Sequence, residues 1–223
     1  MSHAYAQTTA DTTRTHRVSL QCGALIVDFL ETRRVVSSAP FGGGLTRRRY
    51  FANYTVSNRF ESDDVDATIR DLLQRNALPP DETTCALTAV DVSHYRVGQA
   101  LEKTVQASVY VTAGTGNLSA PGLTPLAHRA GGTINVLALV TADLPDAAMV
   151  ETIQIVTEVK ARCLAGYQTS DGYPATGTST DTVTVALLPG SRQSYAGAVT
   201  PVGRALARAT EEALTLALSG TSA

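Results

Sequence analysis

Residues 133–141 read TINVLALVT, and apart from Asn135 and the two terminal threonines every residue in this stretch is apolar. The stretch is too short to cross a membrane, which takes about 20 apolar residues. An almost wholly apolar run of this length is typical of a strand that other elements cover on both faces. The sequence therefore predicts a buried strand in a sheet with neighbours packed on each side.

Helices are predicted after this strand and near the end of the chain. Residues 146 to about 167 form a long helix, with Asp146 as N-cap and Gly166 near its end. Apolar residues cover most of its circumference, so we expect this helix to be buried. A last helix over residues 201–218 begins with Pro201, whose fixed φ suits the first turn.

The remaining elements are strands and one early helix. The helix starts at an Asp63 N-cap and ends before Pro79. Apolar, β-branched and aromatic runs predict strands over residues 18–30, 34–37, 50–56, 85–90, 105–113 and 181–188. Several strands follow one another without a helix between them, which argues against a purely parallel sheet. The predicted fold is α+β, or mixed α/β: a single-domain layered sandwich of helices on a mixed β-sheet over residues 18–219, after a disordered tail of residues 1–17.

The charge balance narrows the functional class. The chain of 223 residues carries 18 basic and 20 acidic side chains, a net charge of −2 that gives no field to attract nucleic acid. The densest basic cluster is Arg47, Arg48 and Arg49. It is interpreted as a solvated turn or as the rim of a site for a polar or phosphate-bearing ligand. We expect no nucleic-acid partner.

Cysteine usage and hydropathy indicate the compartment. Three well-separated cysteines without a CxxC pair suit a reducing environment. The first 17 residues are polar and lack the apolar core of a secretory signal, and no apolar run is long enough to span a bilayer. The sequence predicts a cytoplasmic protein without membrane insertion, and it leaves the oligomeric state open, a homo-oligomer included.

Two charged residues interrupt the apolar surface of the long predicted helix. Burying either Glu158 or Lys160 without a partner would cost several kcal/mol, so each needs a partner or reaches a cleft. The alternative is an exposed strip on which Glu158 pairs with Arg162 one turn later. Such a pair stabilises a helix by only a few tenths of a kcal/mol.

A hydroxyl-rich loop is the second candidate site. Residues 175–181 read ATGTSTD, a sequence that can present hydroxyls and backbone N–H groups to an oxyanion or an amide. Its alternative is a turn whose side chains bond their own backbone. Asn53 and Asn135 lie inside predicted strands, where their amides need partners. No zinc-type grouping of His and Cys, no GxSxG and no SxxK motif occurs, so neither a metal site nor a familiar hydrolase signature is predicted.

Read together, several stretches resemble the adenosylcobinamide amidohydrolase family over roughly residues 35–207. They are SSAPFGGGL (37–45), TAVDV (88–92), TAGTGN (112–117), GGTINVLALV (131–140), TEVK (157–160), ATGTSTDTV (175–183), YAG (195–197) and TPVGR (200–204). Their order and spacing match the family, and the ATGTxTD loop after a T-E-x-K helix is quite specific. Residues 54–60 depart from the family pattern, in which a Pro and acidic residues are more usual.

The resemblance implies hydrolysis of the amide that joins aminopropanol to a propionate arm of the corrin ring, with release of adenosylcobyric acid for cobamide salvage. The adenosylated corrinoid is then the substrate, and no cofactor is expected. One sequence detail agrees with this, because Asp91, His94 and Gly98 have the wrong spacing for the DxHxxG motif that supplies a histidine ligand to cobalt.

Amide hydrolysis needs an activated water or hydroxyl, donors for the oxyanion and an acid for the departing amine. Glu158 is expected to act as the general base and Lys160 as its electrostatic or acid partner. The hydroxyls of residues 178–180, together with Asn135, would supply donors or the nucleophile, and Asp181 would orient their loop. The predicted catalytic set is Glu158, Lys160, Thr178, Ser179, Thr180 and Asp181, and the predicted binding set is Gly43, Gly44, Asn53, Asn117, Thr133, Asn135, Thr176 and Gly177.

Two other functions stay open at this point. One is a corrinoid-binding protein that lacks catalytic activity and stores or delivers its ligand. The other is a different amidase or an acyltransferase that uses a Thr or Ser of the 175–181 loop as nucleophile.

Overall fold

The computed structural model describes residues 15–58, 60–126 and 131–220. In chain order the elements are β1 (Arg17–Gln21), β2 (Ala24–Ser37), β3 (Gly44–Thr55), α1 (Val65–Arg75), β4 (Thr83–Thr88), β5 (Arg96–Glu102), β6 (Val105–Ala113), β7 (Leu118–Ser119), β8 (Ile134–Asp143), α2 (Asp146–Cys163), β9 (Gly177–Thr178), β10 (Thr182–Arg192) and α3 (Pro201–Ser219). Single 3-10 turns lie at Pro80–Glu82 and Val92–His94.

Within the described residues the main sheet is mixed and has eight strands. Its order is β4-β3-β2-β10-β8-β6-β5, with β1 paired to β2 outside this path. The pairs β3–β4 and β8–β10 are parallel, and the others are antiparallel. Residues 134–140 of β8 are all buried, as the apolar run predicted. The predicted mixed sheet is confirmed.

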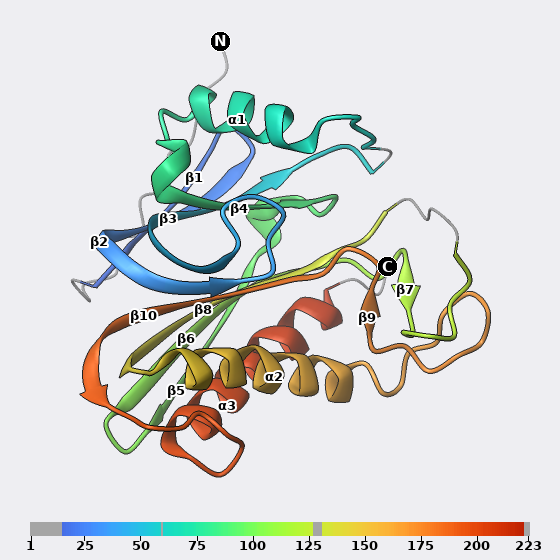
Figure 1. Ribbon diagram of the computed structural model, residues 1–223. Coiled ribbons are helices and arrows are strands. Elements are labelled where there is room, and N and C mark those ends of the chain that lie inside the picture. The colour runs from blue at the N-terminus through green and yellow to red at the C-terminus, as the bar shows by residue number, and fades with distance from the viewer. Residues whose placement is uncertain (1–14, 59, 127–130, 221–223) are drawn as a thin grey trace.

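The sheet turns back on itself at a bulge in β2. Its pairing with β3 is interrupted between Asp28 and Arg33, and Leu30 within this gap has a positive φ of 64°. The Asp28 carboxylate holds the bend, since it accepts a hydrogen bond from Leu30 N at 2.8 Å and pairs with Arg49 Nε at 3.1 Å. Bulges bend a strand and increase its twist. The first half of the sheet (β1–β4) therefore faces the second half (β5, β6, β8 and β10), as Figure 1 shows.

Three apolar clusters hold the resulting four layers together. Side chains such as Phe29, Phe51 and Leu137 fill the space between the two halves of the sheet. Helix α1 covers the outer face of the first half through Ile69 and Leu73. Helices α2 and α3 cover the outer face of the second half in the largest cluster. The predicted layered α+β sandwich of helices on a mixed sheet is confirmed.

The single strand predicted over residues 18–30 is wrong, because the chain reverses there. β1 and β2 form a hairpin whose two-residue turn consists of Cys22 and Gly23, with φ angles of 48° and 73°. Two positive φ values are typical of a type I′ turn, for which Asn-Gly is the usual signal. Cysteine at the first position gives no such signal. The short strand predicted over residues 34–37 is the end of β2.

Strand β5 was not predicted. Gly98 in its centre lowers the β-propensity of the segment, yet the packing requires it, because a Cβ there would lie 2.1 Å from Ala209 O of α3. Glycine inside a strand often marks such a close backbone approach. The Glu212 carboxylate of α3 then accepts a hydrogen bond from Gln99 N at 2.8 Å, so the helix also caps this edge of the sheet.

Two helices differ from their predictions in detail. Asp64, rather than Asp63, caps α1 and accepts a hydrogen bond from Ala67 N at 2.9 Å. Helix α2 has Pro145 as N-cap, with Asp146 as its first residue, and it ends at Cys163 rather than near residue 167. One face of α2 is exposed, Val150 to 48%, so this helix is not buried all round.

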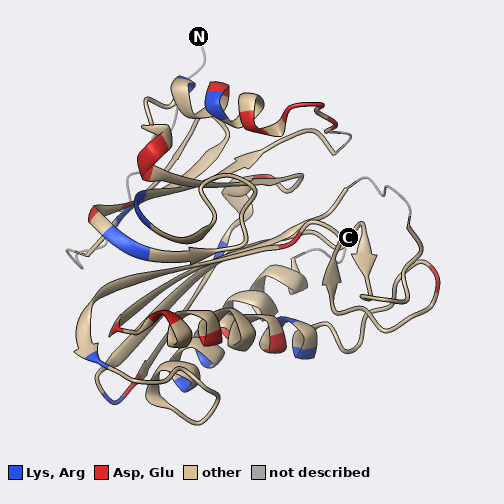
Figure 2. Cartoon of the chain, in the orientation of Figure 1, with Lys and Arg blue, Asp and Glu red and all other residues tan. Residues whose placement is uncertain are grey.

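The arginine cluster lies in a strand and not in a turn. Arg47, Arg48 and Arg49 belong to β3, at the bend visible in Figure 2. Arg48 donates to Asp81 O at 2.9 Å, and Arg49 pairs with Asp28. These two arginines therefore stabilise the fold.

Part of the predicted N-terminal tail over residues 1–17 is described in the structure. Of the predicted tail, residues 1–14 lie outside the described residues, but His16 Nε2 lies 2.7 Å from the Tyr110 hydroxyl of β6. In the described ranges no helix has the length and apolar character needed to span a membrane.

Candidate active site

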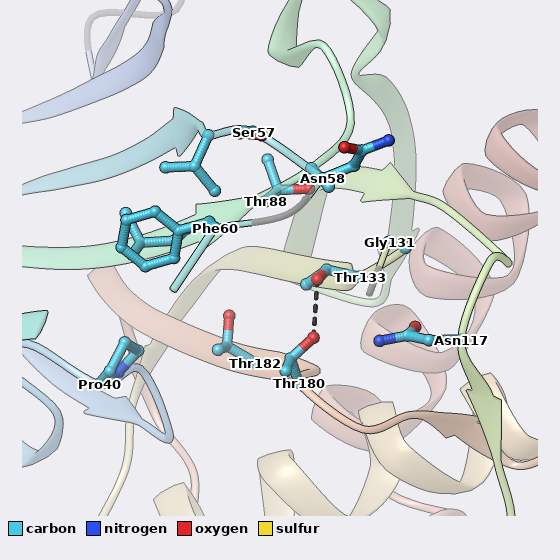
Figure 3. A pocket seen from close by; sticks show the side chains of 14 residues that line it. Pro40, Ser57, Asn58, Phe60, Thr88, Asn117, Gly131, Thr133, Thr180 and Thr182 are labelled. Carbon is cyan, nitrogen blue, oxygen red and sulfur yellow. Dashed lines mark hydrogen bonds between the residues drawn. The ribbon is translucent and has the colours of Figure 1, made fainter. Parts of the chain in front are cut away.

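A cavity of about 210 Å³ lies at the end of the sandwich where β8 and β10 begin and where β3 and β4 end (Figure 3). It is lined by Pro40, Val56, Ser57, Asn58, Phe60, Leu87, Thr88, Ala89, Asn117, Gly131, Gly132, Thr133, Thr180 and Thr182. Both halves of the sheet contribute to it. Ligand sites occupy the corresponding place in the mouths of β-barrels.

Hydroxyl and amide groups form one wall of this cavity. The hydroxyls of Thr133 and Thr180 lie 2.8 Å apart, and the Asn117 amide donates to Ser179 Oγ at 3.0 Å. Oδ1 of Asn117 is buried and has no hydrogen-bond partner among the described residues. A buried unpaired acceptor costs about 1–3 kcal/mol, and such exceptions require a reason such as a bound ligand or water.

A buried network of amides links the two halves next to the cavity. The Asn135 amide donates to Asn53 Oδ1 at 2.9 Å and to Leu87 O at 2.8 Å. Its own oxygen accepts from the Thr182 hydroxyl at 2.9 Å, and Asn53 donates to Thr112 Oγ1 at 3.0 Å. The two asparagines that the sequence singled out therefore satisfy one another. They do not line the cavity but fix Thr182 and Leu87, which do.

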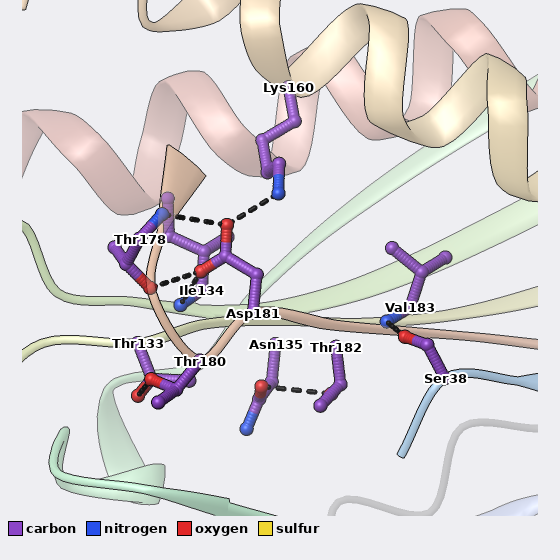
Figure 4. Close-up of polar contacts among 10 residues, drawn as sticks. All are labelled: Ser38, Thr133, Ile134, Asn135, Lys160, Thr178, Thr180, Asp181, Thr182 and Val183. Carbon is purple, nitrogen blue, oxygen red and sulfur yellow. Dashed lines mark hydrogen bonds and ion pairs between the residues drawn. The ribbon is translucent and has the colours of Figure 1, made fainter. Parts of the chain in front are cut away.

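The Asp181 carboxylate holds the hydroxyl-rich loop of residues 175–181 in place through several hydrogen bonds (Figure 4). Its carboxylate accepts hydrogen bonds from Thr178 N and from Ile134 N, both at 2.9 Å, and also from the Thr178 hydroxyl. Lys160 of α2 forms an ion pair with the same carboxylate, and both side chains are buried. The predicted role of Asp181 in orienting the loop fits this geometry, and Lys160 finds the partner that its burial requires.

Position 177 requires a glycine because the ion pair of Lys160 and Asp181 lies directly against it. A Cβ at this position would be 2.5 Å from Asp181 Oδ2 and 2.9 Å from Lys160 Nζ. The neighbouring Thr176 donates its backbone N–H to Ser119 O at 3.0 Å and does not line the cavity. Gly177 and Thr176 thus belong to the framework of the loop rather than to the wall that a ligand would touch.

Two glycine-rich segments pack backbone against backbone beside the loop. Gly132 has a φ of 82°, and a Cβ on it would lie 2.5 Å from Gly116 N and 2.8 Å from Gly114 O. This contact places Asn117 at the cavity wall together with Gly131 and Gly132. The TAGTGN and GGTINV stretches are therefore joined in space as parts of one site.

Glu158 does not join this site. It is exposed, whereas Lys160 two residues later is buried, because positions two apart on a helix point about 200° away from each other. A general base on the outer face of α2 cannot reach the cavity, so the predicted role of Glu158 does not fit the structure. The alternative pair with Arg162 is not formed either, since Arg162 bonds to Glu211 Oε2 of α3 at 2.9 Å.

Gly43 and Gly44 are also displaced from the cavity, where binding was predicted. A Cβ on Gly43 would lie 2.5 Å from Ala39 O, and Gly44 opens β3 with a φ of 88°. Their lack of a side chain serves the tight β2–β3 turn. Of that turn only Pro40 lines the cavity.

The segment after β3 was missed as part of the site. Val56, Ser57, Asn58 and Phe60 all line the cavity, and Phe60 N donates to Ser57 O at 2.9 Å in a local turn. These residue types carry no catalytic pattern. The sequence feature that could have pointed to this segment was the departure of residues 54–60 from the family pattern.

The described part of the cavity wall is uncharged. Among the described residues that line it, none has an ionisable side chain. The described part of the chain also contains no group of three or more His, Cys, Asp or Glu side chains placed to hold a metal ion. The adjacent buried charges are Lys160 and Asp181, which neutralise each other behind the loop.

Comparison with known proteins places the chain among hydrolases that act on an amide bond. It belongs to the adenosylcobinamide amidohydrolase family, whose model matches residues 6–223. A Halobacterium salinarum protein named adenosylcobinamide amidohydrolase is 32% identical over 195 residues, which cover 83% of this chain and 80% of that protein. The crystal structure of the PH0078 protein from Pyrococcus horikoshii OT3 has a TM-score of 0.50 at 11% identity, covering 91% and 78% of the two chains, and this similarity concerns the fold alone.

Proposed function

We propose that this protein hydrolyses the amide between aminopropanol and a propionate arm of adenosylcobinamide, releasing adenosylcobyric acid for cobamide salvage in the cytoplasm. The observation that carries the proposal is the family match over residues 6–223. The corrinoid is the substrate in this reaction, and no cofactor takes part.

The size of the cavity supports binding of one arm of the substrate. Its volume of about 210 Å³ is smaller than the roughly 300–1,000 Å³ typical of pockets for drug-sized molecules. A corrin ring with its many substituents is much larger than such molecules. The ring therefore stays outside, against the surrounding loops, while an arm enters.

The polar wall supplies hydrogen bonds for the scissile amide. One of the two paired hydroxyls of Thr133 and Thr180 donates to the other, which leaves the proton of the second free to bind the carbonyl oxygen. Donors aimed at this oxygen stabilise the charge that develops on it in the tetrahedral transition state. Asp181 and Lys160 contribute by holding the loop in position.

We assign the attack to water. The Thr178 hydroxyl is bonded to Asp181, and Ser179 Oγ accepts from Asn117, so both have structural roles. Hydrolysis adds one water across the C–N bond: its oxygen stays on the carbonyl carbon as the new carboxylate, and both of its protons end on the amine, which leaves as an ammonium ion.

The first experiment incubates the purified protein with adenosylcobinamide, with and without EDTA, and follows both products by mass spectrometry. Equal amounts of adenosylcobyric acid and aminopropanol, at the same rate in both samples, are expected. Corrinoid binding without product would favour the non-catalytic corrinoid-binding protein. Loss of turnover with EDTA would refute the cofactor-free reaction.

A matched pair of variants tests the site itself. Thr180→Val removes a hydroxyl from the cavity wall, and loss of one oxyanion donor lowers kcat by about 100-fold or more. Thr176→Val removes a hydroxyl outside the cavity and should leave kcat within about twofold. Labelling of Thr180 or Ser179 by an electrophilic substrate analogue would point instead to a covalent acyl-transfer mechanism.

A further inference from the structure

The cavity has two chemically different sides. Figure 3 shows Phe60 and Pro40 at one end and Asn117 at the other, with the hydroxyls of Thr133 and Thr180 between them. Val56 and Leu87 add further apolar surface to the lining. A group that fills this space therefore presents a hydrocarbon part to one side and a hydrogen-bonding part to the other.

The described part of the cavity lining carries no charge. None of these residues is ionisable, so a charged group would lose its hydration without gaining an ion pair from them. The part of the ligand that enters should be small, uncharged and amphipathic.

Only the free end of a corrin arm can enter a cavity that is too small for the ring. In the substrate proposed above that end is amide-linked aminopropanol, which carries a hydroxyl and a methyl on the same carbon. We infer that the cavity is the subsite for this leaving group, and that the apolar side formed by Phe60, Val56 and Leu87 selects substrates that carry the methyl.

The inference rests on the proposed function and adds a specificity to it. The hydroxyl of the leaving group donates to a hydroxyl oxygen on the threonine side of the cavity, which leaves the free threonine proton for the carbonyl oxygen, and the methyl contacts the Phe60 ring and the Val56 side chain. Removing one methyl from a ligand in an apolar pocket reduces kcat/KM by about 10- to 200-fold. We expect the loss in kcat/KM on removal of the methyl to lie at the lower end of this range, because the cavity is not fully closed around the leaving group.

The test compares adenosylcobinamide with its analogue that carries aminoethanol in place of aminopropanol. The wild-type enzyme should show a kcat/KM ratio of about ten in favour of the methyl-bearing substrate. Phe60→Ala should lower kcat/KM for adenosylcobinamide while leaving the aminoethanol analogue nearly unchanged, so that the ratio approaches one. Tyr195→Ala, which removes an aromatic ring that is 69% exposed and does not line the cavity, serves as control and should keep the wild-type ratio.

A second variant tests whether the effect of Phe60→Ala comes only from a general loosening of the loop. Val56→Thr keeps the side-chain volume and replaces a methyl with a hydroxyl, so it should also reduce the preference while the protein stays folded. A wild-type ratio near one, or equal losses on both substrates in Phe60→Ala and Val56→Thr, would overturn the inference. Failure of the wild-type enzyme to cleave adenosylcobinamide would instead overturn the proposed function, and the two failures are thus distinguishable.

Discussion

Lys160 of α2 and Asp181, the residue before β10, form an ion pair in which the two side chains are only 9% and 8% exposed. Backbone N–H groups of Thr178 and Ile134 donate to the same carboxylate. Burial of an ion pair is favourable only when such additional hydrogen bonds offset the loss of hydration. The pair therefore ties the helix layer to the loop at the cavity.

Lys160→Met should destabilise the protein strongly, because it leaves the Asp181 carboxylate buried without its cation. Removal of one partner of a buried pair costs about 3–5 kcal/mol of the free energy of unfolding, which urea denaturation measures. Arg162→Met on the same helix breaks a pair whose side chains are 58% and 52% exposed, and it should cost less than about 1 kcal/mol. Similar costs for the two variants would contradict this account.

Gly177→Ala should disturb the same pair from the other side. The new Cβ would lie 2.5 Å from Asp181 Oδ2, and overpacking of this kind costs about 1–3 kcal/mol. We expect turnover to fall together with the melting temperature, since the loop carries Thr180. Gly166→Ala adds a methyl where no atom lies within 4 Å and should change stability by less than about 0.5 kcal/mol. An unaltered Gly177→Ala enzyme would show that the loop does not need this close contact.

Asn53 and Asn135 should behave as a coupled pair in a double-mutant cycle. Asn135→Ala removes the donor to Asn53 Oδ1 and to Leu87 O, and each buried unpaired group costs about 1–3 kcal/mol. Asn53→Ala combined with Asn135→Ala removes both ends of their bond, so the double variant should be destabilised by less than the sum, with a coupling of at least about 0.5 kcal/mol. Additive changes in the free energy of unfolding would mean that the network acts as independent bonds.

The three cysteines should differ in their reactivity towards a thiol reagent at pH 8. Cys22 is exposed in the β1–β2 turn, whereas Cys85 of β4 is fully buried. Burial raises the pKa of the Cys85 thiol, which lowers the fraction of reactive thiolate at any given pH. Burial also raises the pKa of Cys163, which is only partly covered. We expect Cys22 to react first and Cys85 only as the protein unfolds; prompt labelling of native Cys85 would contradict its burial.

Hydrophobic patterning predicted the centre of this fold better than its periphery. The limits of β6 agree with the predicted strand over residues 105–113, and β8 agrees within two residues, because both strands are buried along most of their length. The Cys22–Gly23 turn and the bulge at Leu30 could not be read in the same way. Cys22 and Leu30 have positive φ angles although neither is a glycine or an asparagine, so tertiary packing decides these conformations.

Several polar residues that the sequence singled out lie in pairs in the structure, while their catalytic and binding roles stay predictions. Lys160 and Asp181 were named separately and form one pair, and Asn53 and Asn135 form another. The sequence left the exposed position of Glu158 undecided, because α2 is apolar over much of its surface and its sequence therefore does not reveal which face is exposed. Phe60 and Pro40 were not predicted because their proximity depends on how the two halves of the sheet close.

The bend in β2 and β3 has a consequence for how the protein folds. Because both strands run through the bend and pair on either side of it, neither half of the sheet has its full set of strands without the other. We expect unfolding to be one cooperative transition, with refolding slowed by the long-range pairing of β2 with β10. Since residues of both halves line the cavity, we expect a partly folded chain whose halves have not yet come together to lack a binding site.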